Sequence, residues 1–427
     1  MKKLNWPLIH AWATYDFAIN VFSMNMITTY FALWVIRDHG ASDLTYGLAK
    51  GLSMAVVALI SPLLGSLSDR SGTRKPYLAA CIALYVACSF VLGFTGNLWV
   101  GLVLFGLANI GLQMSTVYYN ALLPGISTPE TMGRISGYGK ALSYVGSVVA
   151  VLVGMAFATG KLLGMPLPIP AGGSQAVFIP TAILALLAGL PVLLANFPQA
   201  PARAGAHVGH PSWGRIIRDL RDTKALPGVG LFLLASVFFF DTINTLRDFM
   251  AVYLVKVVGL SETGGSLQSF LLVVVLCSLV GAIGWGFVTD RLGPKRALVG
   301  VLGLLAIAFG SLVFVTSKAI VLSVTGPLAG IAFGGVLVTT RPLLARLVPQ
   351  DRLGEFFGLF ILANDFGAIF GPITWGLTVE ALKHQGLVAY QAAVGLQLVF
   401  LLIGLALILK LKVPEKAPEP VAEVTVS

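Results

Sequence analysis

Charge is scarce in this sequence: of 427 residues, only 11% are Asp, Glu, Lys or Arg, and 57% are hydrophobic. Soluble domains carry about a quarter charged residues. The shortage excludes an ordinary soluble protein. It predicts a chain buried in lipid, where apolar runs of roughly 20 residues can satisfy their backbone hydrogen bonds only as helices.

Metal ligands and nucleophiles are also scarce. The sequence has three Cys and five His residues, with no CxxC pair and no His pair inside an apolar run. Cys81, Cys88 and Cys277 stand in apolar segments, which predicts buried thiols rather than a disulfide or a metal site. The phosphate-binding pattern G-x-x-x-x-G-K-[ST] is absent, which argues against an ATP-driven pump formed by this chain. We therefore expect no cofactor, no metal and no enzymatic activity.

The net charge of +10 does not indicate nucleic-acid binding, because the basic residues stand at the ends of apolar runs rather than on one face. With the N-terminus placed inside, most of the 28 Lys and Arg residues fall on the inner side. The outer loops carry only Arg37, Lys161, Lys256, Lys318 and Lys383. This distribution predicts cytoplasmic termini, and we expect an integral protein of a bacterial inner membrane.

Apolar runs separated by Gly, Pro and charged residues predict twelve spanning helices. The first run follows Lys2 and Lys3 but is interrupted by Asp16 and Asn20, so it predicts a spanning helix rather than a signal peptide. The first six helices are predicted over residues 8–36, 44–67, 76–95, 98–123, 132–160 and 174–197. The second six are predicted over residues 226–257, 263–289, 294–316, 318–347, 353–382 and 387–411.

A polar, Pro-containing stretch separates the two sets of helices. We predict an N-terminal six-helix bundle over residues 1–197, a cytoplasmic linker over 198–225, a C-terminal six-helix bundle over 226–412 and a disordered cytoplasmic tail over 413–427. Within the linker, basic residues recur every third position between Trp213 and Lys224. This pattern favours a short amphipathic interfacial helix, and a solvated charged loop is the alternative.

An internal repeat relates the two sets. Gly65-Ser-Leu-Ser-Asp69-Arg70-Ser-Gly72 matches Gly286-Phe-Val-Thr-Asp290-Arg291-Leu-Gly293 at an offset of 221 residues. The segment from Leu122 to Gly137 matches that from Leu343 to Gly358 at the same offset. Two separate matches at one offset indicate a duplication of a six-helix unit.

These loop sequences resemble the signature G-x-x-x-D-R-x-G-R-R/K of the major facilitator superfamily. Arg74 and Lys75 complete the first copy, although Thr73 stands where the first basic residue is usual. The resemblance implies an all-α membrane protein with twelve transmembrane helices in two bundles related by pseudo-two-fold symmetry. It also implies a secondary transporter, a symporter or antiporter, that works by alternating access.

A narrower resemblance lies in the first helix, where Trp12-Ala-Thr-Tyr15-Asp16-Phe17-Ala-Ile-Asn20 is similar to the W-x-x-Y-D-F-A-N-S-x-F opening of the Atg22-like, or UMF1, branch. Phe240-Asp241-x-x-Asn244 also fits that branch. The asparagine of the first helix comes one residue later than in the family. The resemblance implies a small polar solute such as an amino acid, because members are linked to amino-acid export from the fungal vacuole.

Ionisable residues inside spans mark the candidate transport site, because each costs several kcal/mol unless it is paired or hydrated. Asp16 and Asn20 share one face of the first helix, and Asp241, Asn244 and Asp248 share one face of the seventh. The family architecture places both helices at a central cavity, so we expect Asp16 and Asp241 to bind substrate or protons. The alternative is that each carboxylate is permanently paired and only fixes helix packing. The available cations are Lys50, Lys140, Arg247 and Arg341.

Further candidates lie on other helices. Asn109, Gln113 and Asn120 fall near one line of the fourth helix, which predicts either a cavity-lining stripe or hydrogen bonds between helices. Arg341 is expected either to bind an anionic group or to reach toward the membrane surface. For gating on the cytoplasmic side, the family signature implicates a set of loop residues, to which we add Asp365 of the eleventh helix. The gating set is Gly65, Asp69, Arg70, Gly72, Arg74, Gly286, Asp290, Arg291 and Asp365.

Other functions fit the sequence less well. A membrane enzyme lacks a nucleophile, base or metal set, and a non-transporting sensor lacks a large appended domain. Buried carboxylates are compatible with proton coupling. We expect a monomer in contact with membrane lipid that carries a small solute, and a hydrophobic or lipid-like solute is the alternative.

Overall fold

The computed structural model describes residues 5–71, 74–127, 129–198, 228–261, 265–314, 317–348 and 353–414. The predicted interfacial helix, nearly all of the predicted linker and the tail beyond residue 414 lie outside this part of the chain. Gly72 of the predicted gating set also lies outside it. The predicted domain boundaries therefore stay predictions.

The first bundle begins with α1 (Trp6–Phe22), which continues without a break through η1 (Ser23–Tyr30), α2 (Phe31–Leu33) and η2 (Trp34–Asp38). The remaining helices are α3 (Asp43–Ser71), α4 (Lys75–Leu92), α5 (Leu98–Ile126), α6 (Pro129–Thr159) and α7 (Phe178–Leu194). A two-residue antiparallel ladder of β1 (Lys161–Leu162) and β2 (Met165–Pro166), followed by η3 (Gln175–Val177), connects α6 to α7.

The second bundle contains α9 (Val229–Lys256), α10 (Ser266–Leu292), α11 (Pro294–Phe314), α12 (Lys318–Ile320), η5 (Val321–Thr325) and α13 (Gly326–Leu347), followed by α14 (Leu353–Ala381), η7 (Lys383–Gln385) and α15 (Leu387–Lys410). Within the described residues, twelve helices are long and apolar enough to cross a membrane. The predicted all-α architecture is confirmed.

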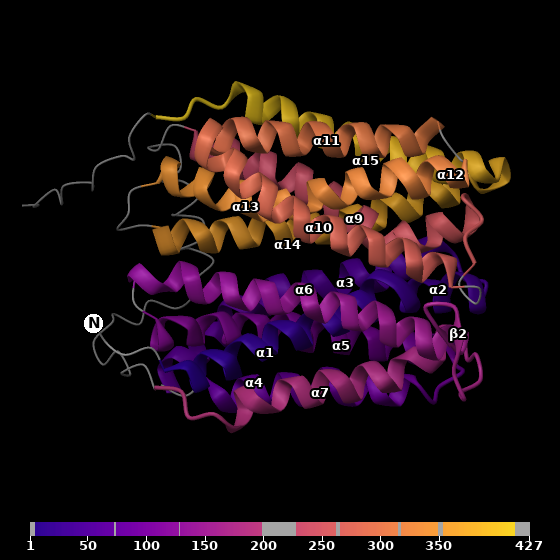
Figure 1. The fold of residues 1–427 in the computed structure, drawn as a ribbon, viewed down its shortest axis with the longest axis horizontal. Helices are drawn as coiled ribbons and strands as arrows, with labels where there is room; N and C mark the ends of the chain where they lie inside the picture. The colour runs from indigo at the N-terminus through magenta and orange to yellow at the C-terminus, as the bar shows by residue number, and fades with distance from the viewer. Residues whose placement is uncertain are drawn as a thin grey trace, which may run out of the picture.

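The two bundles lie side by side with their helices roughly parallel (Figure 1). We call the end at which α1 begins and α15 ends the terminal side, and the other end, at which α3 begins, the opposite side. Within the bundles α1 packs against α6 and α7, and α9 packs against α14 and α15. Between the bundles α3 packs against α14, and α6 packs against α10.

The internal repeat reappears in the helix ends. α3 ends at Ser71 and α10 ends at Leu292, while α5 ends at Ile126 and α13 ends at Leu347. Both pairs are separated by the 221-residue offset found in the sequence. The duplicated loops therefore follow equivalent helices of the two bundles.

Two helices are shielded far more than the others. The most apolar window of the α1 span is 78% buried and that of α9 is 72% buried, whereas the other spans reach at most 50%. The remaining helices present large apolar side chains outward, among them Trp99, Leu194, Phe287 and Phe314. Because lipid does not reach the buried faces of α1 and α9, their polar residues must be satisfied by protein or by water.

Candidate functional site

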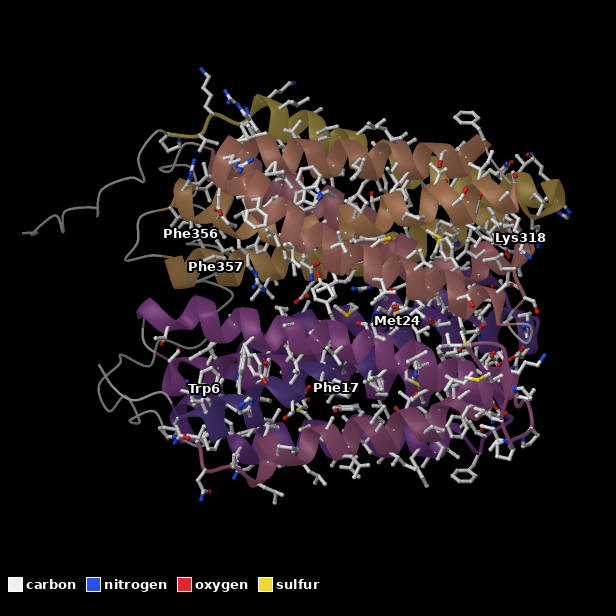
Figure 2. The ribbon with its side chains drawn as sticks, in the orientation of Figure 1. Trp6, Phe17, Met24, Lys318, Phe356 and Phe357 are labelled. Atoms are coloured by element: carbon white, nitrogen blue, oxygen red, sulfur yellow. The ribbon has the colours of Figure 1, made fainter. Side chains whose placement is uncertain are left out.

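A mixed-charge cluster, which we call the Asp16 cluster, consists of Asp16 on α1, Lys140 on α6 and Arg341 on α13. Trp6, Phe17 and Met24 follow one another from the terminal side toward the opposite side (Figure 2), which places Asp16, the neighbour of Phe17, well inside the span. Asp16 is only 4% exposed, and its Oδ1 lies 3.0 Å from the Nζ of Lys140 on α6. Arg341 of α13, in the other bundle, interacts electrostatically with Asp16. Asp16 is therefore paired with a cation of its own bundle and interacts electrostatically with a cation of the other.

Both cations are accessible although they stand within spanning helices. The Lys140 side chain is 42% exposed, and Arg341 is exposed. Both interact with the buried Asp16 while part of each side chain stays accessible. From the sequence, Lys140 could be named only as one of several cations that could pair with a carboxylate, because its contact with Asp16 joins residues 124 positions apart.

Close packing of α6 on α1 brings the cluster together. A Cβ at Gly139 would lie 2.7 Å from the Trp12 ring and 3.0 Å from Oδ2 of Asp16, so only glycine fits there. Asn20 binds α6 as well, since its amide donates to the Ser143 hydroxyl and its Oδ1 accepts from Ser147 at 3.4 Å. Asp16 and Asn20 therefore share the α6-facing side of α1, as their spacing predicts.

Asp241 is isolated. It is 4% exposed, and its Oδ2 has no hydrogen-bond partner among the described residues. Within the same part of the chain it forms no ion pair. The α9 backbone at Asp241 lies against Gly367 of α14, and a Cβ at Gly371 would overlap the Thr245 hydroxyl. The carboxylate therefore lies where α9 and α14 pack tightly.

The other predicted residues of α9 bind across helices. Asn244 donates to Oδ1 of Asn364 on α14 at 3.1 Å. Asp248 is fully buried and lies 4.0 Å from the Nζ of Lys50, on α3 of the first bundle. Its second ion-pair partner is the adjacent Arg247 at 3.6 Å. The predicted cavity residues of α9 thus form contacts separate from the Asp16 cluster.

The polar stripe of α5 mainly joins helices of one bundle. Asn109 accepts from Lys50 at 3.1 Å and donates to Ser53 at 2.8 Å, and Gln113 approaches the sulfur of Met54. These partners all belong to α3, which favours the interhelical alternative for Asn109 and Gln113. Asn120, near the terminal side, is exposed.

The predicted gating residues are only partly visible. Gly65, Asp69 and Arg70 belong to α3, but their side chains lie outside the described part of the chain. Arg74 donates to the Ala121 carbonyl at the end of α5, in its own bundle. Gly286, Asp290 and Arg291 occupy the end of α10, where Asp290 and Arg291 are exposed. Asp365 of α14 interacts electrostatically with Lys50.

The opposite side is closed by contacts that the sequence analysis did not anticipate. Asp43, at the start of α3, accepts hydrogen bonds from Tyr390 at 2.8 Å and Trp375 at 3.4 Å, and Lys256 lies 4.0 Å away. All three partners belong to the second bundle. A cavity of about 460 Å³ borders this cluster, lined in part by Lys256, Lys383 and Tyr390, and it is separate from the Asp16 cluster. In the sequence Asp43 comes directly before a predicted helix, where a carboxylate ordinarily stabilises the helix N-terminus. A contact with the second bundle was therefore not expected.

The chain matches the family model of the Major Facilitator Superfamily over residues 17–325 and 271–426. It is 24% identical over 386 residues to "Uncharacterized MFS-type transporter YxiO" of Bacillus subtilis (strain 168), covering 87% of this chain and 88% of that one. It is also 24% identical over 374 residues to "Multidrug resistance protein MdtG" of Dickeya zeae (strain Ech586), covering 87% of each.

Solved structures share the fold. A bacterial homolog to the human lysosomal transporter Spinster, in an inward-facing and occupied conformation, superposes with a TM-score of 0.73 at 18% identity, covering 96% of this chain and 97% of that chain. A D-xylose-proton symporter superposes with a TM-score of 0.66 at 15% identity, covering 92% and 95%. The twelve helices, the duplicated loops and the family match agree, and the chain belongs to the Major Facilitator Superfamily as a membrane transporter.

Proposed function

We propose that this transporter carries a small solute bearing both a carboxylate and an amino group, of the amino-acid type, between the bundles by alternating access coupled to protons. The Asp16 cluster is the observation that carries the proposal. Its two accessible cations, Lys140 and Arg341, suit a carboxylate, and Asp16 suits an ammonium group. The Atg22-like opening of the first helix supports the same solute class.

Charge strengthens recognition of such a solute. Charged hydrogen bonds contribute about 1.5–3 kcal/mol each, more than neutral ones, and Lys140 and Arg341 come from different bundles. A carboxylate held between them would therefore draw the bundles together around the solute. The arrangement fits a site that is completed when the solute binds.

The test is thermal stability of the purified transporter against amino acids, matched amines lacking the carboxylate, matched acids lacking the amine, and lysolipids. A ligand of the folded state raises stability by RT ln(1 + [L]/Kd), so weak solutes register at millimolar concentration. We expect amino acids to raise Tm, and Arg341→Gln to abolish the rise. Stabilisation by amines or acids as strong as that by amino acids would refute the zwitterionic class.

A hydrophobic or lipid-like solute is the second candidate. The similarity to proteins named for multidrug resistance favours it. Three charged groups in the candidate site disfavour it, because each would lose its hydration beside an apolar solute. Stabilisation by lysolipids alone would make this candidate the correct one.

For the coupling ion we propose the proton, bound at Asp241. A buried carboxylate without a cation is far less costly when it is protonated. The close fit of Gly371 against Thr245 leaves little room for the coordination shell of a metal ion. In proteoliposomes, Asp241→Asn should lose accumulation driven by a proton gradient yet retain solute exchange. Retained gradient-driven accumulation would rule Asp241 out.

For placement, we propose a bacterial inner membrane with the terminal side in the cytoplasm, supported by the basic residues of the predicted inner loops. The closed opposite side then faces outward, and the exposed cations of the Asp16 cluster face inward. We further propose that the monomer is the transporting unit.

A further inference from the structure

One face of α3 closes the opposite side of the molecule. Asp43, Tyr46, Gly47, Lys50 and Gly51 stand at positions i, i+3, i+4, i+7 and i+8, which aligns them on one side of the helix. We call these five residues the α3 gate face. All five contact the second bundle, so this face forms the seal between the bundles.

Most of the seal is apolar or backbone packing. Tyr46 meets the edge of the Phe249 ring at 5.1 Å. A Cβ at Gly47 would overlap the Pro372 carbonyl, and one at Gly51 would lie 2.9 Å from the Ile369 carbonyl. Such close approach is possible only because both positions are glycine. The charged members of this face are Asp43, at its beginning, and Lys50, a cation farther along the helix.

The Lys50 charge is buried against acidic groups of the other bundle. Lys50 is 2% exposed and Asp248 is 0% exposed, with 4.0 Å between Nζ and Oδ2. Lys50 also interacts electrostatically with Asp365 of α14. Asn109, from its own bundle, provides a hydrogen bond at 3.1 Å but no charge. The charge of Lys50 is therefore compensated from across the seal.

The charge of Asp248 in turn depends on Lys50 for compensation. Neither of its carboxylate oxygens has a hydrogen-bond partner among the described residues. Within the part of the chain that the structure describes, its ion-pair partners are Lys50 and Arg247 at 3.6 Å, which is on the same helix and 49% exposed. If the bundles part on this side, Arg247 moves with Asp248 while Lys50 is withdrawn. Asp248 thus exchanges Lys50 for water whenever the seal opens.

We propose that Lys50 and Asp248 form the ion pair that holds the opposite side closed and that must separate in every transport cycle. A buried charge left without its partner is strongly destabilising, whereas replacing both partners by neutral groups is often tolerated. Neutralising Lys50 alone therefore raises the free energy of the closed state more than that of the open state, in which water hydrates Asp248. This role is independent of which solute is carried.

The experiment measures the distance distribution between spin labels at Lys161 and His384, exposed positions of the two bundles on the opposite side. The full chain is used, with Cys81, Cys88 and Cys277 replaced by Ala. In Lys50→Gln and in Asp248→Asn, we expect the ratio of long to short distances to rise at least about tenfold. The double variant should return toward the unsubstituted distribution.

Lys383→Gln is the matched control. Lys383 pairs with Glu380 of its own bundle at 2.7 Å and is exposed, so its loss should leave the distribution unchanged. Lys50→Arg keeps the charge and should also leave the distance distribution unchanged. If Lys50→Gln does not fold, Asp248→Asn is compared with Lys50→Arg instead. The proposal is overturned if Lys50→Gln keeps the short distance, if Lys50→Arg shifts the distribution like a neutral residue, or if the double variant is displaced as far as the single ones.

Discussion

At the scale of single residues, the site differs from the sequence-based expectation in how its charges are compensated. Asp16 is paired with a cation, whereas Asp241 is buried without one in the described part of the chain. An ionised group in a span requires a partner or water, so the two aspartates are suited to different tasks. The paired one can exchange its cation for a solute, and the unpaired one can bind a proton.

Lys140→Gln tests the first task. We expect the solute affinity to fall at least tenfold, because a charge-assisted contact worth about 1.5–3 kcal/mol is removed. The fold should persist, since Lys140 is 42% exposed and Arg341 still faces Asp16. Titration of Tm with the stabilising solute measures the affinity. Lys318→Gln is the control, as Lys318 lies far from Asp16, on the opposite side (Figure 2). An unaltered affinity in Lys140→Gln would remove this residue from the site.

At the scale of helices, glycine determines which faces can meet. A Cβ at Gly371 of α14 would overlap the Thr245 hydroxyl on α9, whereas one at Gly358 of the same helix would have nothing within 4 Å. Overpacking a tight contact costs about 1–3 kcal/mol. The two positions of one helix thus differ sharply in what they can accommodate.

We therefore expect Gly371→Ala to lower Tm clearly, and Gly358→Ala to leave it unchanged or raise it slightly through helix propensity. Combining Gly371→Ala with Thr245→Ala removes the overlapping hydroxyl and should recover most of the loss. Thermal unfolding of the purified variants provides the comparison. Equal Tm values for the two glycine variants, or no recovery in the double variant, would show that the α9 and α14 contact is not tight at Gly371.

Helix positions could be read from the sequence because lipid imposes continuous apolar runs and loops interrupt them with charge. The pairing of side chains could not, because it depends on which helix faces touch. Lys140 and Asp16 are 124 positions apart, and Asp43 and Tyr390 are 347 apart. Asp43 was therefore missed as a functional residue, and Lys50 could be named only as one of several cations available to pair with a carboxylate.

At the scale of the whole molecule, the duplicated bundles are equivalent in topology but not in their charges. The Asp16 cluster and the seal take Asp16, Lys140 and Lys50 from the first bundle, and Asp248 and Arg341 from the second. Among the described residues, the hydrogen bonds and ion pairs that join the bundles lie toward the opposite side, including that of Gln268 with Tyr30 at 3.1 Å. Alternating access requires a conformation in which one side is closed while the solute site stays accessible from the other. Closure of the opposite side and the exposed cations of the Asp16 cluster fit such a conformation.

Membrane orientation decides which compartment that state faces, and single cysteines can determine it. In a chain with the three native cysteines replaced by Ala, His384→Cys on the opposite side should react with an impermeant maleimide in intact cells. Trp6→Cys, exposed on the terminal side, should react only after the membrane is permeabilised. The reason is the basic charge of the predicted inner loops, which are held in the cytoplasm during insertion. Labelling of Trp6→Cys but not of His384→Cys in intact cells would invert the orientation, and the Asp16 cluster would then open outward in this conformation.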